Sequence, residues 1–89
     1  MVGTFGGALE ARRVDASGGR LAAEAVGEVE TEGGVLILKR IHVKYQLKAV
    51  EADRQTVERV HSVHAQSCPV YRSLQGAIAI TTEWRLSTL

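Results

Sequence analysis

The chain has 89 residues, of which 45% are hydrophobic, a formal net charge of +1 at pH 7 and one cysteine. This length favours a single domain over residues 1–89, and the apolar content excludes a disordered chain. The small net charge gives no general attraction to nucleic acid, and no apolar run reaches the 18 residues of a membrane span. One cysteine cannot form an internal disulfide. We therefore expect a cytoplasmic protein with no membrane partner.

The first 14 residues have the spacing of a short helix. Val2, Phe5 and Leu9 recur at helical intervals, and Arg12 and Arg13 lie where cations favour a helix C-terminus. Three glycines in the same stretch are poor helix formers and indicate close approach of another backbone. No capping residue precedes this helix, so the pattern is typical of the later part of a longer one.

Three stretches alternate between polar and apolar residues and predict strands, over residues 21–30, 35–48 and 77–86. Residues 31–34, Thr-Glu-Gly-Gly, predict a hairpin turn between the first two. The second strand shows the clearest alternation: Ile37, Ile41, Val43, Tyr45 and Leu47 form its apolar face, and Arg40, His42, Lys44, Gln46 and Lys48 its polar face. Together with the helices, these strands predict an α+β domain, in which helices cover a three-stranded antiparallel sheet.

The segment that contains the cysteine carries the chemistry. Helical patterns cover residues 53–66 and 69–75, and Gly76 is the expected stop of the second helix. Proline is favoured at the first position of a helix, so Pro69 places Cys68 at the N-cap. Free backbone N–H groups and the helix dipole favour the thiolate there, which is the reactive form. Cys68 is therefore the candidate catalytic residue.

Two other functions are weighed and set aside. The spacing His61-x-x-His64-x-x-x-Cys68 could bring three ligands to a metal ion, but no further Cys or His motif follows. The basic face of the second strand could follow a phosphate backbone, but three glutamates on the preceding strand offset its charge. We expect no metal, no cofactor and no nucleic-acid partner.

Two segments resemble the OsmC/Ohr family, the organic hydroperoxide resistance and osmotically inducible protein C-like proteins. They are residues 38–45, Leu-Lys-Arg-Ile-His-Val-Lys-Tyr, and residues 67–83, Ser-Cys-Pro-Val-Tyr-Arg-Ser-Leu-Gln-Gly-Ala-Ile-Ala-Ile-Thr-Thr-Glu. The resemblance implies a thiol peroxidase that reduces organic hydroperoxides with a thiol reductant and forms an intertwined homodimer. It also implies two cysteines: a reactive one near the start of a long central helix, and a resolving one in the segment of Cys68.

The chain departs from this family at its start. Family members precede this region with several strands, one of which carries an arginine, and with the first half of the central helix. The resemblance therefore places the reactive cysteine at or just upstream of Met1, and implies a truncated thiol peroxidase with Cys68 as the resolving-type thiol. A one-cysteine peroxidase and an inert buried Cys68 remain as alternatives. The second functional hypothesis is a non-catalytic OsmC-like dimerisation or binding module.

Overall fold

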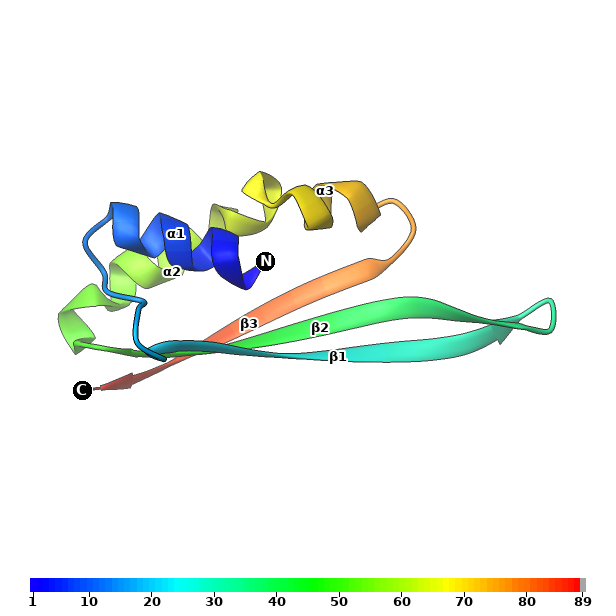
Figure 1. Ribbon diagram of the computed structural model, residues 1–89, viewed down its shortest axis with the longest axis horizontal. Helices are drawn as coiled ribbons and strands as arrows, with labels where there is room; N and C mark the ends of the chain where they lie inside the picture. Colours follow the sequence, from blue (N-terminus) through cyan, green and yellow to red (C-terminus); the bar gives the residue numbers. More distant parts are fainter. Residues whose placement is uncertain (89) are drawn as a thin grey trace.

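The computed structural model describes residues 1–88 and places three helices over one face of a three-stranded sheet (Figure 1). The elements are α1 (Val2–Ala11), β1 (Leu21–Glu32), β2 (Val35–Ala49), α2 (Arg54–His64), α3 (Pro69–Leu74) and β3 (Ala79–Thr88). Single 3-10 turns, η1 (Glu51–Asp53) and η2 (Ala65–Ser67), flank α2. The predicted α+β class and every predicted helix and strand are confirmed.

Strands β1 and β2 form a long antiparallel hairpin, as predicted. Its turn has positive φ angles at Gly33 (58°) and Gly34 (79°), a conformation that glycine adopts without strain. Arg40 of β2 binds two carboxylates of β1, with its Nε 2.9 Å from Glu28 and its second guanidinium nitrogen 2.5 Å from Glu30. The predicted pairing of the basic face with the glutamates is thus confirmed at Arg40.

The expectation of an antiparallel sheet throughout is wrong for β3. This strand pairs with β2 in parallel, from Ala79 opposite Arg40 to Thr88 opposite Ala49, so the sheet is mixed. The helices between the two strands carry the chain back along the sheet (Figure 1), so that β3 begins opposite Arg40 of β2. A connection that returns the chain in this way forces the next strand to run in the same direction.

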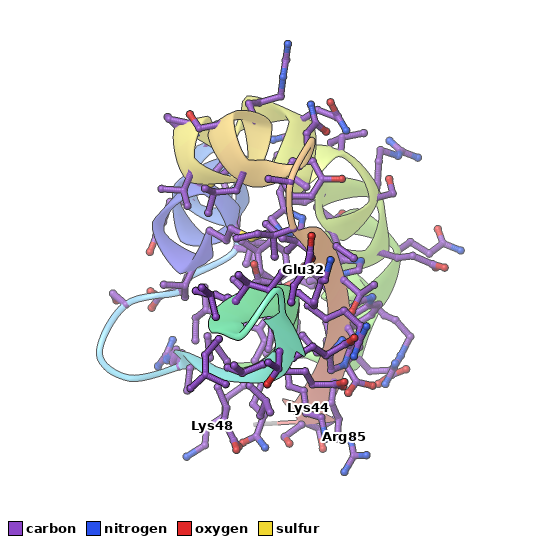
Figure 2. All side chains as sticks on the ribbon, turned by 90° about the vertical axis from the view of Figure 1, so that its right-hand side faces the viewer. Glu32, Lys44, Lys48 and Arg85 are labelled. Carbon is purple, nitrogen blue, oxygen red and sulfur yellow. The ribbon has the colours of Figure 1, made fainter. Side chains whose placement is uncertain are left out.

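The core lies between the helices and one face of the sheet. Its buried side chains come from three elements and one loop. They are Phe5 and Leu9 of α1; Val14 of the loop that follows α1; Val43, Tyr45, Leu47 and Ala49 of β2; and Val57 and Val60 of α2. The opposite face of the sheet is polar, and Figure 2 shows Lys44, Lys48 and Arg85 pointing away from the helices. None of the helices within residues 1–88 has the length and apolarity needed to cross a membrane.

The hairpin extends well beyond the helices, which gives the molecule extents of 50 × 21 × 20 Å (Figure 1). Its distal part carries apolar side chains that no helix covers. Leu36 is 72% exposed, Val35 61% and Val29 56%. This uncovered hairpin, residues 29–38, is the largest departure from a closed core.

Phe5 is the residue whose truncation we expect to destabilise the fold most. Its side chain is fully buried, and Phe5→Ala removes a ring that α1 inserts between β2 and α2. The free energy of unfolding should fall by about 3–5 kcal/mol. Urea unfolding followed by circular dichroism measures the change.

The matched control is Val2→Ala on the same helix, because Val2 is 42% exposed. It should change the free energy of unfolding by no more than about 0.5 kcal/mol. Equal losses in the two variants would contradict the placement of Phe5 at the centre of the core.

Candidate functional site

Cys68 lies between η2 and α3, and its side chain is 2% exposed. It is the N-cap of α3, with Pro69 at the first helical position, as the sequence predicts. Its backbone is held on both sides, because its N–H donates to the carbonyl of Ala65 at 3.0 Å and its carbonyl accepts from the N–H of Arg72 at 3.0 Å. The main chain at the thiol is therefore fixed by the two turns that flank it.

Opposing effects act on the pKa of the Cys68 thiol. Burial raises the pKa, whereas the N–H group of Tyr71, the amino group of Met1, the N–H group of Val70 and the hydroxyl group of Thr4 lower it. The lowering effects win, so the pKa lies below its ordinary value. Cys68 makes no side-chain capping hydrogen bond of ordinary geometry, so the N–H groups of α3 act mainly as dipoles. The thiol therefore ionises more readily than an ordinary cysteine.

Thr4 is a neighbour of the thiol that the sequence analysis missed. The resemblance places a partner cysteine at or just upstream of Met1, whereas the α1 side chain that lowers the pKa of the Cys68 thiol is Thr4. Thr4 directly precedes the buried Phe5, which holds this part of α1 in the core. The position of the reactive cysteine stays a prediction, and α1 is the helix that faces Cys68.

Tyr45 and His64 form a buried hydrogen bond beside the thiol. The hydroxyl oxygen of Tyr45 lies 2.9 Å from Nε2 of His64, and Nδ1 of His64 lies 2.6 Å from the carbonyl oxygen of His61. A carbonyl oxygen can only accept, so Nδ1 carries the proton in the neutral ring and Nε2 accepts the hydrogen bond from Tyr45. Burial, and to a lesser degree the charge of Cys68, raises the pKa of Tyr45 to about 12. Tyr45 therefore remains a donor at neutral pH.

His61 and His64 are both engaged away from Cys68. Nε2 of His61 lies 2.8 Å from the hydroxyl oxygen of Thr82 on β3, and the two imidazole rings lie 5.1 Å apart. Within residues 1–88, no three His, Cys, Asp or Glu side chains converge on a point where they could hold a metal ion. The spacing of these histidines thus serves contacts with the sheet.

An apolar groove of about 240 Å³ lies between the sheet and the starts of α1 and α3. One wall is formed by Met1, Val2 at the start of α1, and Val70 and Leu74 of α3. Aliphatic side chains of all three strands form the other. The amino group of Met1 and the N–H group of Val70 are also among the groups that lower the pKa of the Cys68 thiol. An apolar molecule or segment could reach the surroundings of the thiol along this groove.

Residues 2–83 match the family described as OsmC-like protein. No curated protein sequence matches the chain. Three solved structures are similar to it. A hypothetical protein from Aquifex aeolicus VF5 has a TM-score of 0.74 and 14% identity, and the match covers 99% of this chain and 68% of that one. An OsmC like protein from Mycoplasma pneumoniae has a TM-score of 0.73 and 17% identity, with coverage of 94% and 60%.

The third structure is the organic hydroperoxide resistance protein OhrB of Bacillus subtilis, with a TM-score of 0.59 and 18% identity. The match covers 94% of this chain and 62% of that protein. At these identities the similarity shows the fold. The chain spans between 60% and 68% of the length of the three structures.

Acidification should destabilise the fold through the two buried imidazoles. Burial is the main cause that lowers the pKa of both His61 and His64 below 6.5, their value in an unfolded chain. The unfolded state then binds more protons, so stability is complete above about pH 6.5 and falls as the pH decreases towards the folded pKa. The loss approaches about 1.4 kcal/mol per pH unit for each histidine. Urea unfolding between about pH 7.5 and 5.5 measures it.

The variant His64→Gln serves as the control for this titration. Glutamine can accept the hydrogen bond from Tyr45 but does not titrate, so the dependence on pH should weaken and leave the part due to His61. The same dependence on pH in both proteins would show that His64 does not contribute.

Proposed function

Because the chain belongs to the family of OsmC-like proteins, we propose that it takes part in the reduction of organic hydroperoxides, with Cys68 as the resolving thiol. One observation carries this proposal: the Cys68 thiol is buried against the start of α1 and has a lowered pKa. The fold is also that of a protein whose name states resistance to organic hydroperoxides. A thiolate in this position is suited to attack a sulfur atom brought to the start of α1.

The reaction has three balanced steps. A hydroperoxide, ROOH, oxidises a reactive cysteine to its sulfenic acid and leaves as the alcohol ROH. The thiolate of Cys68 attacks the sulfenic sulfur, so that a disulfide forms and water is released. An external dithiol then reduces the disulfide and is itself oxidised. The sequence contains one cysteine, so this scheme needs a second thiol that residues 1–89 do not supply.

The cytoplasm is the compartment that this proposal requires. Its thiol reductants keep lone cysteines reduced and can supply the electrons of the last step.

A second thiol on α1 should convert the chain into a peroxidase. The hydroxyl group of Thr4 acts on the Cys68 thiol, so Thr4→Cys places a sulfur atom beside Cys68. We expect the wild-type chain to show no sustained turnover of cumene hydroperoxide with dithiothreitol, and Thr4→Cys to gain turnover at least tenfold above it. Peroxide consumption measures the gain, and mass spectrometry should show an internal disulfide two mass units below the dithiol form.

Gly3→Cys is the matched control, because nothing lies within 4 Å of the Cβ position at Gly3. This variant also has two thiols but should form no internal disulfide. The double variant Thr4→Cys with Cys68→Ser should lose the turnover. Equal activity in the variants with cysteine at position 3 or 4 would contradict Cys68 as the resolving thiol.

We propose, as a second candidate function, a non-catalytic dimerisation or binding module. In this function the chain forms a homodimer and Cys68 performs no reaction. The support is the uncovered hairpin, where Leu36 is 72% exposed and Leu38 40% exposed. Apolar side chains gathered on one projecting hairpin are typical of a surface that another chain covers. A homodimer is also what the family resemblance implies.

Leu36→Lys should weaken this dimer. The wild-type chain should have twice the mass of one chain by light scattering, and the variant should shift towards the monomer because a lysine would be desolvated in the interface. Val63→Lys on α2 is the control, since Val63 is also exposed (52%) but lies off the hairpin. A wild-type monomer would contradict the dimer, and Cys68→Ser should leave the mass unchanged.

A further inference from the structure

The position of Cys68 is coupled to that of His64 by a continuous piece of helical chain. His64 ends α2, and both His64 and Ala65 have right-handed helical backbone angles. The turn η2 follows without a break, and the N–H of Cys68 donates back to the carbonyl of Ala65 at 3.0 Å. A displacement of His64 therefore displaces the thiol.

Tyr45 fixes His64 to the most strongly held part of the sheet. Tyr45 lies on the central strand β2, paired with Ala23 of β1 on one side and with Trp84 of β3 on the other. Its hydroxyl group is the donor to Nε2 of His64, at 2.9 Å. Figure 1 shows α2 above this part of β2. The hydrogen bond thus joins the end of a helix to a strand that is paired along both edges.

Phe5 closes the same contact from α1. Its ring lies 4.6 Å from the ring of Tyr45 and 5.0 Å from that of His64. The next residue towards the N-terminus is Thr4, whose hydroxyl group acts on Cys68. Two routes, through η2 and through α1, therefore connect the Tyr45–His64 pair to the thiol.

Tyr45 and His64 take no part in the proposed reaction. They are polar side chains that are nevertheless buried, with exposed fractions of 2% or less. Polar groups in such a place are tolerated only when they are fully hydrogen-bonded, and they then fix one arrangement of the core. We propose that Tyr45 and His64 are positioning residues for Cys68. The hydrogen bond between Tyr45 and His64 fixes the end of α2 on the sheet and so keeps the thiol of Cys68 beside α1. The proposal rests on Cys68 as the resolving thiol of the proposed function, but it is tested without hydroperoxide.

The test is the pH dependence of the alkylation of Cys68 by iodoacetamide, measured on the full chain. The midpoint of this profile reports the pKa of the thiol, and the limiting rate at high pH reports its accessibility. In Tyr45→Phe, the end of α2 is released and the donors around the thiol lose their alignment. The midpoint should rise by about half a pH unit or more, which is a roughly threefold smaller thiolate fraction at neutral pH.

Thr82→Val is the matched control. It also removes one hydroxyl group from this core, but that group binds His61 and not His64. Its midpoint should equal that of the wild type. A residue with a merely structural role would raise the limiting rate without moving the midpoint, so a folded Tyr45→Phe variant with the wild-type midpoint would overturn the proposal.

A pair of substitutions at His64 tests the proposal even if Tyr45→Phe does not fold. His64→Gln keeps an acceptor for Tyr45 and should keep the wild-type midpoint, whereas His64→Leu removes the acceptor and should raise the midpoint. Equal midpoints in these two variants would overturn the role of the hydrogen bond. Neither measurement needs a second thiol, so a failure here is distinct from the absence of peroxidase turnover in Thr4→Cys.

Discussion

The packing of Phe5 against Tyr45 and His64 is the interaction on which the rest of the structure depends. It joins α1, β2 and α2 at one point, with ring separations of 4.6 and 5.0 Å. A chain of this length buries a smaller share of its surface than a larger domain does, so each fully buried aromatic ring carries a large part of the stability. Because the helices cover only one face of the sheet, residues 1–88 contain no second core to compensate for a loss here.

Local patterns in the sequence predict most of the fold. The alternation of β2 is readable because every second side chain, from Val43 to Ala49, is buried against the helices. The N-cap at Cys68 is readable because Pro69 restricts the backbone at the first helical position. Both signals arise from residues within a few positions of one another, which is the range over which a sequence pattern can be interpreted directly.

The direction of β3 is not encoded in such a pattern. Residues that alternate along a strand do so equally in a parallel and an antiparallel pair, so the alternation of Ile80, Thr82 and Trp84 predicts the strand but not its orientation. The informative signal lies in the connection, since residues 50–78 hold two helices where an antiparallel neighbour needs only a short turn. That signal concerns topology and appears only when the elements are considered together.

The candidate site shows the same division. Cys68 itself is predicted from its neighbours, whereas Thr4 of α1, which lowers its thiol pKa, and Tyr45 of β2, which binds His64, are far away in the sequence. The i, i+3 spacing of His61 and His64 suggests ligands on one helix face, yet the two rings bind Thr82 and Tyr45 on the sheet. Spacing within a helix shows which side chains share a face, but not which partners the opposing element supplies.

These contacts bear on what kind of reaction Cys68 can perform. A thiol that is 2% exposed meets dissolved reagents slowly, whatever its state of ionisation. A lowered pKa still raises the fraction of the thiolate, the form that attack on sulfur requires. Burial with a lowered pKa is suited to a thiol whose partner sulfur is held beside it by the fold. It is less suited to a thiol that must first react with a hydroperoxide from solution. Burial and ionisation together therefore favour the resolving role over one-cysteine chemistry.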